Sequence, residues 1–159
     1  QANDDSINYV HNEVGYNYRL TNVQAAMGVG QLERINEFVD KKKYINNFYK
    51  DFFSNSSIFS ILESPKETRN NHWMSSLLIN EVTEKLNLEN LIKYLTINQI
   101  QVRPMWHLCH LQLPYLENET YQIDNSLDLR KRVLNIPCST NIKDEELEKV
   151  CNVLSNFSK

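Results

Sequence analysis

Apolar and polar positions repeat along this chain with two periods, one typical of helices and one typical of strands. From about Asn22 the apolar residues recur at helical spacing near one side of the chain, and this pattern continues past residue 50. We expect one helix over residues 22–54, which is long for a small domain but ordinary for a connection between two domains. Its apolar positions are Val23, Met27, Leu32, Ile35, Phe38, Val39, Ile45, Phe48 and Phe52.

The pattern beyond residue 57 predicts short strands and further helices. Asn87 is typical of a helix N-cap and precedes an apolar stripe with helical spacing. Pro104 is expected to end a strand, because proline donates no ladder hydrogen bond. The expected elements are strands over 58–62, 72–79 and 100–103, helices over 88–95, 127–133 and 144–156, and a strand or turn over 135–139. This order indicates an α+β domain whose small antiparallel sheet is covered by helices on one face.

Composition narrows the range of functions. The chain has 159 residues, of which 41% are apolar, and a formal net charge of -3. These values fit one globular domain and provide no basic field for a nucleic acid. No apolar run approaches the roughly 20 residues of a membrane span, so we expect neither nucleic acid nor membrane as a partner. The three cysteines fit no zinc spacing and are expected to remain reduced in the cytoplasm.

The most distinctive part of the chain is the point where an aromatic, extended segment (14–20) meets a helix start. Thr21 and Gln24 stand three residues apart, which is the spacing of a capping box. The first helical turns then carry small residues, including Gly28 and Gly30. Two glycines so close together in a helix favour close approach by another backbone or by a ligand.

Residues 15–34 read G-Y-N-Y-R-L-T-N-V-Q-A-A-M-G-V-G-Q-L-E-R. This run resembles the signature that follows the cofactor lysine in sugar aminotransferases of the DegT/DnrJ/EryC1/StrS family, and residues 1–5 and 11–13 resemble the family just upstream. Those enzymes have fold type I and use pyridoxal 5'-phosphate (PLP). The resemblance implies the tail end of a PLP-binding large domain at 1–21, a long connecting helix at 22–54 and a C-terminal small domain at 55–159.

No catalytic residue is expected within this chain. The family's PLP lysine lies between a serine-bearing strand and a glycine-rich loop, and no lysine here has that setting. With only three glycines, the chain also contains no glycine-rich phosphate loop. The lysine would belong to a preceding part of the protein, so the chain alone is expected to be inactive, whether it is a truncated reading frame, a product of a split gene or an isolated fragment.

Asn17 and Arg19 are the candidate cofactor-binding residues. In an extended segment they point to the same side, and both side chains donate hydrogen bonds that suit phosphate oxygens. In the resembling family a side chain of this motif reaches the PLP phosphate of the partner subunit, a role assigned here first to Asn17. From the residues alone, a turn-stabilising asparagine and a surface arginine are the alternative. Tyr16 and Tyr18 would face the other way, as packing residues.

The irregular stretch R-P-M-W-H-L-C-H at residues 103–110 holds the candidate substrate-binding residues. It resembles the R-P-x-W-x-x-x-H segment of family members that act on nucleotide-linked amino sugars, which implies a loop that lines the sugar-nucleotide site at a dimer interface. Trp106 would offer an apolar face to a sugar or base, and Arg103 and His110 would donate hydrogen bonds. A buried tryptophan with a surface histidine is the alternative. A metal site around Cys109 is not expected, because zinc sites use wider, paired spacings.

Two further features receive structural interpretations. Lys41, Lys42 and Lys43 are expected on a solvated helix face rather than on a phosphate, as runs of like charge usually are. Cys138 is interpreted as structural, because no glycine elbow and no evident base accompany it.

The resemblance implies a PLP-dependent transaminase that acts as a homodimer. It would move an amino group from a donor such as glutamate to a keto carbon of a nucleotide-linked deoxysugar, for surface polysaccharide or glycan synthesis. The alternative is a non-catalytic dimerisation or binding module. The DNA upstream of Gln1 discriminates between them, because an in-frame strand, lysine and glycine-rich loop would indicate the enzyme.

Overall fold

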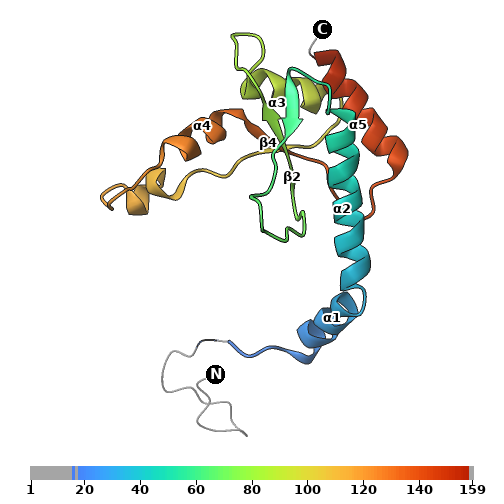
Figure 1. Ribbon diagram of the computed structural model, residues 1–159. Coiled ribbons are helices and arrows are strands. Elements are labelled where there is room, and N and C mark those ends of the chain that lie inside the picture. Colours follow the sequence, from blue (N-terminus) through green and yellow to red (C-terminus); the bar gives the residue numbers. More distant parts are fainter. Residues whose placement is uncertain (1–15, 17, 158–159) are drawn as a thin grey trace, which may run out of the picture. The chain divides into compact units, whose positions relative to one another are not determined.

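The computed structural model describes residue 16 and residues 18–157. The chain divides into two compact units, Gln1–Glu37 and Phe38–Lys159. The described part of the first unit holds helix α1 (Asn22–Leu32) and the start of helix α2 (Ile35–Phe52). The second unit holds the rest of α2, a four-stranded sheet and three further α-helices (Figure 1).

Helix α1 begins at the predicted capping box. Thr21 Oγ1 accepts a hydrogen bond from the backbone N–H of Gln24 at 3.3 Å, and Gln24 Oε1 accepts one from the backbone N–H of Thr21 at 3.0 Å. This reciprocal pair satisfies one amide of the first helical turn and the amide of the N-cap itself. The capping interaction inferred from the residue spacing is therefore confirmed.

The single continuous helix predicted over residues 22–54 is wrong in one respect. A turn at Glu33 and Arg34 separates α1 from α2, and there the Arg34 N–H bonds to the carbonyl of Gln31 at 3.2 Å. Gly28 and Gly30 weaken the helix before this turn, by about 1 kcal/mol each relative to alanine. Apolar periodicity does not register such a break, because two neighbouring helices can continue the same spacing.

Four short antiparallel strands form the sheet. They are β1 (Phe59–Ile61), β2 (Ser75–Ile79), β3 (Arg103–Pro104) and β4 (Val133–Ile136), in the spatial order β1-β2-β4-β3. In the central pair, Leu77 lies opposite Leu134. The small antiparallel sheet predicted from the sequence is thus confirmed, with β1 and β3 at its edges.

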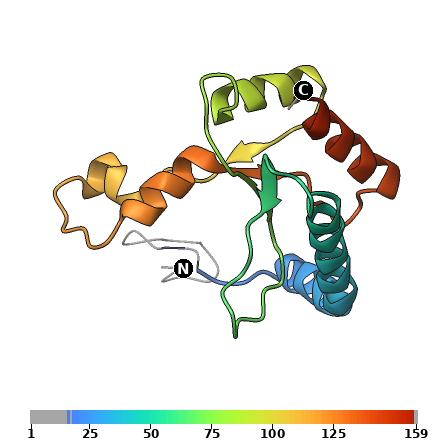
Figure 2. The same cartoon turned by 45° about the horizontal axis from the view of Figure 1, so that its top comes forward.

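One face of the sheet carries the hydrophobic core. Strand residues of this face pack with α2, α3 (Leu88–Ile97) and α5 (Asp144–Phe157), which come together around the sheet (Figure 2). Burying such side chains is worth about 1.5–3 kcal/mol each, so this face dominates the stability of the unit. Its fully buried members include Ile45, Tyr49, Leu77, Ile79, Leu91, Leu95, Leu134, Leu147 and Leu154.

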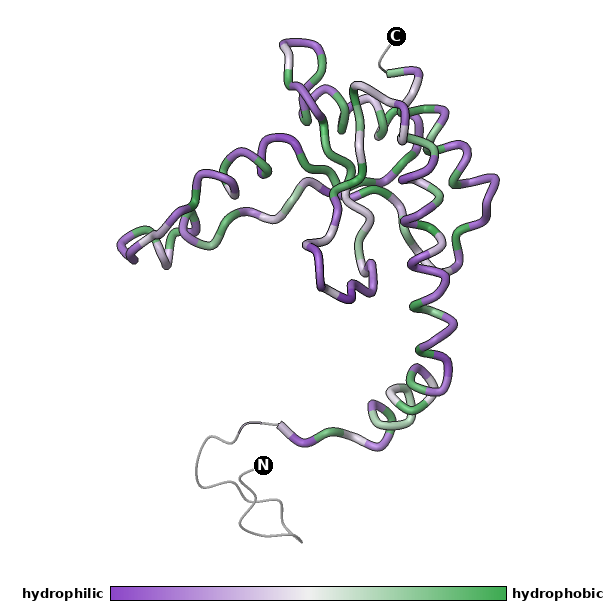
Figure 3. Tube along the Cα trace, viewed as in Figure 1, coloured by the Kyte–Doolittle hydropathy of each residue, from purple (hydrophilic) through white to green (hydrophobic). Residues whose placement is uncertain are grey.

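The opposite face of the sheet is more polar. Ser76 and Asn135 lie opposite each other on β2 and β4, and Ser76 Oγ donates to Asn135 Oδ1 at 2.8 Å. Helix α4 (Asp124–Arg132) contacts β2, and its last residue, Arg132, donates to the carbonyl of Ile79. Figure 3 shows the contrast between the apolar central strands and the mainly hydrophilic α4.

Several boundaries differ from those predicted. Of the strand expected at residues 100–103, only Arg103 pairs with β4, and the pairing continues to Pro104. Ile100 and Val102 are instead buried in the hydrophobic core. After β3 the chain runs through two single-turn 3-10 helices, η1 (Cys109–Leu111) and η2 (Leu113–Tyr115), before α4 returns to the sheet. Along the described part of the chain, no helix combines the length and apolar character needed to cross a membrane.

Candidate functional site

The predicted cofactor-binding residues belong to the first unit. Asn17 lies outside the described residues, so its predicted role stays a prediction. Arg19 is exposed, two residues before the α1 cap. Tyr16 and Tyr18 are 68% and 90% exposed and stack on each other with ring centroids 5.8 Å apart. Within the described chain they contact each other and no core, so their predicted packing role stays a prediction.

Helix α1 presents its apolar side chains to solvent. No residue of α1 is buried, and a Cβ atom added at Gly28 or Gly30 would meet nothing within 4 Å. The close approach predicted from these glycines therefore has no partner within the described chain and stays a prediction. Exposed apolar side chains of this kind are typical of a surface that another structure covers. On α1 they are Val23, Met27, Val29 and Leu32, and Leu20 lies just before the N-cap.

The predicted substrate-binding residues belong to the second unit. Arg103 lies in the edge strand β3 with its side chain exposed, and Nη1 donates to the carbonyl of Val102 at 3.1 Å. It lines a groove of about 220 Å³ that also reaches Met74 before β2 and Cys138 after β4. Its guanidinium makes no other hydrogen bond to a described residue, so the remaining donors can serve a ligand in this groove.

Trp106 is 60% exposed, so the alternative of a buried tryptophan does not hold. Its indole lies almost parallel to that of Trp73, with ring centroids 5.7 Å apart and 16° between the ring planes. Trp73 is itself 62% exposed. Sequence reasoning treated Trp73 as a strand residue and missed this pair. The available signal was that these are the chain's only two tryptophans.

Trp73 is held by Lys42, a residue of α2. Lys42 Nζ donates to the carbonyl oxygens of Trp73 and Cys138, at 3.0 and 2.6 Å. The prediction that residues 41–43 form a solvated face is therefore wrong for Lys42, because the ammonium turns inward to satisfy two carbonyls. Cys138 is buried, and its Sγ lies 3.5 Å from the same Trp73 carbonyl, which fits a structural role.

His110 lies in η1 and is only half-buried, yet its Nε2 atom is buried and has no hydrogen-bond partner among the described residues. A buried polar atom without a partner costs about 1–3 kcal/mol, which favours a site completed by a ligand or a water. Within the described chain, no hydrogen bond or ring contact joins His110 to Arg103 or Trp106. The structure therefore brings the groove at Arg103 and the tryptophan pair into one unit but does not link His110 to them.

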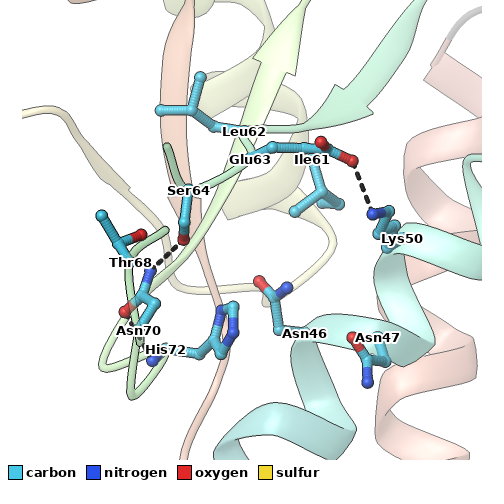
Figure 4. A pocket seen from close by; sticks show the side chains of 10 residues that line it. All are labelled: Asn46, Asn47, Lys50, Ile61, Leu62, Glu63, Ser64, Thr68, Asn70 and His72. Carbon is cyan, nitrogen blue, oxygen red and sulfur yellow. Dashed lines mark hydrogen bonds and ion pairs between the residues drawn. The ribbon is translucent and has the colours of Figure 1, made fainter. Parts of the chain in front are cut away.

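A second cavity, of about 260 Å³, lies between α2 and the loop from β1 to β2 (Figure 4). Its polar walls mostly satisfy one another: Lys50 pairs with Glu63 at 2.6 Å, and Asn70 Nδ2 donates to Ser64 Oγ at 2.7 Å. His72 borders it, and burial together with the charge of Lys43 lowers the pKa of its imidazole. No residue predicted from the sequence to bind a ligand lines this cavity.

The comparison with protein families identifies the class. Residues 1–155 match the DegT/DnrJ/EryC1/StrS aminotransferase family, and the chain belongs to this family. Aminotransferases of this family depend on PLP. The resemblance that residues 15–34 carried is thus confirmed.

Individual relatives agree with this assignment. The chain is 31% identical over 150 residues to GDP-perosamine synthase of Escherichia coli O157:H7, covering 94% of this chain and 39% of that protein. It is 29% identical over 160 residues to the putative PLP-dependent aminotransferase EpsN of Bacillus subtilis, covering 97% and 40%. The chain thus spans about two fifths of the length of these relatives.

Solved structures confirm the fold. Helicobacter pylori PseC, an aminotransferase involved in pseudaminic acid biosynthesis, matches with a TM-score of 0.79 at 18% identity, covering 97% of this chain and 42% of that one. A GDP-4-keto-6-deoxy-D-mannose-3-dehydratase from E. coli with bound hydrated PLP matches with a TM-score of 0.72 at 19% identity, covering 95% and 40%. The α+β fold is thus shared with this group of PLP proteins.

The described residues do not fit a complete PLP site. A Schiff-base lysine must be able to lose its proton and reach the aldehyde of the cofactor. Lys42 is held by two carbonyl oxygens, and the pKa of Lys50 is raised by its bond to Glu63. Apart from Lys41, Lys42 and Lys43, the described lysines are exposed.

Proposed function

We propose that this chain is the C-terminal portion of a PLP-dependent aminotransferase that aminates a nucleotide-linked keto-deoxysugar for surface polysaccharide or glycan synthesis. The observation that carries the proposal is the match of residues 1–155 to the sugar aminotransferase family. Relatives named for GDP-perosamine and for a UDP-linked amino sugar support a nucleotide-sugar substrate. A donor such as glutamate would supply the amino group.

The features of the 103–110 segment support a ligand role for this part of the chain. Trp106 presents a wide apolar ring to solvent, Arg103 lines a groove, and His110 keeps a buried nitrogen without a partner among the described residues. A flat ring suits a base or the apolar face of a sugar, and a guanidinium suits a diphosphate. We assign substrate contact to these three residues on that chemistry.

The cofactor's covalent partner is proposed to lie outside this chain, because none of the described lysines fits it. Asn17, with Arg19 second, is proposed to bind the PLP phosphate of the partner subunit in a homodimer. Cytoplasmic location and inactivity of the isolated chain belong to the same proposal. The second candidate, a non-catalytic dimerisation module, is favoured by one observation, the exposed apolar surface of α1.

Sequencing the DNA upstream of the Gln1 codon tests the origin of the missing lysine. An in-frame strand, lysine and glycine-rich loop supports the enzyme. A stop codon directly upstream, with no lysine-bearing partner that forms a complex with this chain, contradicts it and leaves the module.

The assembled enzyme allows a sharper test at Asn17. One hydrogen bond to a charged phosphate is worth about 1.5–3 kcal/mol, so Asn17→Ala should weaken PLP retention by about 10- to 150-fold. Asn22→Ala, from the same segment, is the matched control. Equal loss in both variants would show that the segment only shapes the helix start. Rescue of Asn17→Ala by mixing with subunits that keep Asn17 but lack the lysine would locate the contact across the dimer.

A further inference from the structure

The backbone of Trp73 is fixed at both of its polar groups. Its N–H donates to Asn71 Oδ1 at 3.0 Å, and its carbonyl accepts from Lys42 Nζ at 3.0 Å. The residue before it, His72, has a positive φ of 53°, and its N–H donates to Asn70 Oδ1 at 2.9 Å. A residue held on both sides in this way keeps its side chain near one direction, although the side chain itself is exposed.

Lys42 connects three segments that are far apart in the sequence. It projects from α2 and donates to Trp73, which precedes β2, and to Cys138, which follows β4. Charge-assisted hydrogen bonds are stronger than neutral ones, and a partly buried ammonium is less screened than an exposed one. Lys42 therefore joins the Trp73 backbone to the segment that follows β4.

Trp106, in contrast, belongs to an irregular segment. Residues 105–108 form neither helix nor strand, and the indole of Trp106 is 60% exposed. Its ring contact in the described chain is the stack on Trp73. We propose that Lys42 and Trp73 are positioning residues that fix the indole of Trp106 as a preorganised platform for the base or sugar of a nucleotide-sugar.

This inference rests on the proposed function, because the proposed function is what assigns a nucleotide-sugar ligand to Trp106. Trp73 stacks on the Trp106 ring, and the Trp106 side chain stays 60% exposed beside this contact. A free indole on an irregular segment would lose rotamer freedom on binding, whereas a stacked one has already lost it. Offset aromatic stacking of this kind contributes specific geometry beyond buried area.

The chain's two tryptophans make the stack directly observable. Two parallel indoles couple their electronic transitions, so the circular dichroism spectrum of the chain should show a tryptophan exciton couplet. Lys42→Met keeps both indoles but removes the two hydrogen bonds from Lys42 Nζ to the Trp73 and Cys138 carbonyls. This variant should lose most of the couplet. Lys42→Arg should restore it, because a guanidinium can donate to both carbonyls. Lys43→Met is the matched control, since the ion pair that Lys43 makes among the described residues is with the exposed Asp40, at 3.9 Å.

Fluorescence titration with GDP-mannose and UDP-N-acetylglucosamine supplies the binding readout. Trp73→Ala and Lys42→Met should weaken binding by about 3- to 10-fold, the range that one aromatic pair supports, while Trp73→Phe should stay close to wild type. A couplet that is absent from the wild type, or unchanged in Lys42→Met, overturns the inference. If the couplet depends on Lys42 but the wild-type chain binds neither probe, the proposed function fails at this site, and the ligand role of the platform fails with it.

Discussion

Replacing Tyr49 by phenylalanine removes one hydroxyl group from the centre of the second unit. Tyr49 projects from α2, is fully buried, and donates from its hydroxyl to the carbonyl oxygen of Pro137 at 2.8 Å. The bond joins α2 to the segment that leaves β4. Phenylalanine keeps the ring and its packing, so the substitution tests the hydrogen bond with little change in apolar burial.

The expected loss at neutral pH is about 1–2 kcal/mol of unfolding free energy. A typical hydrogen bond contributes about 0.5–1.5 kcal/mol, and a fully buried carbonyl left without a donor costs about 1–3 kcal/mol. Because Pro137 is only half-buried, water can partly replace the lost donor, and the cost stays in the lower part of that range.

The sign of the effect changes at high pH. Burial, reinforced by the charges of Cys151 and Cys138, raises the pKa of the Tyr49 hydroxyl far above its usual value. Above about pH 10 the unfolded chain releases this proton while the folded chain keeps it, so wild-type stability falls by up to about 1.4 kcal/mol per pH unit. Phenylalanine has no such proton. The advantage of tyrosine should therefore vanish near pH 11 and reverse above it.

Urea unfolding followed by far-UV circular dichroism at neutral pH and at about pH 11 measures both effects. Tyr115→Phe is the control, because Tyr115 is 49% exposed and should change stability little at either pH. If Tyr49→Phe costs the same free energy at both pH values, Tyr49 titrates normally in the folded state. That result would refute the argument from burial.

Two further predictions concern helix α1 and the thiols. Thr21→Ala should remove the capping box with Gln24 and destabilise α1 by about 1 kcal/mol, and faster amide hydrogen exchange in the first turns of α1 would measure this; unchanged exchange would mean that the cap contributes nothing. With a thiol reagent such as Ellman's, the native chain should show one fast-reacting cysteine, Cys109, because Cys138 and Cys151 are buried and burial raises the pKa of Cys151 to about 12. Cys109→Ser should abolish the fast phase, and a fast phase that survives it would show that a buried thiol opens readily.

Local signals in the sequence were sufficient for much of the fold. The caps predicted at Thr21 and Asn87 both form, and α5 (Asp144–Phe157) follows its apolar stripe to within one residue. The strands were harder to place. β3 pairs over only two residues, so its register depends on β4, far along the chain, rather than on its own alternation.

In the candidate site too, local features could be predicted from the sequence and contacts between distant residues could not. The motif around Trp106 was visible in the sequence, but its partner Trp73 was not, because the two residues meet only through the folded sheet. Lys42 was misjudged for a related reason. A run of three lysines indicates a solvated face on average. The carbonyl oxygens that bind Lys42 belong to Trp73, which is 31 positions away in the sequence, and to Cys138, which is 96 positions away.

The two edges of the sheet offer little to another strand that would extend it. Met105 donates to the carbonyl of Val133 at 3.2 Å, and hydrogen-bonding positions alternate along an antiparallel strand, so the nitrogen of Pro104 faces the free edge. Proline has no N–H to offer there, which deprives an incoming strand of its donor. At the other edge, β1 spans only three residues. A foreign β-strand therefore finds no template of useful length on either side.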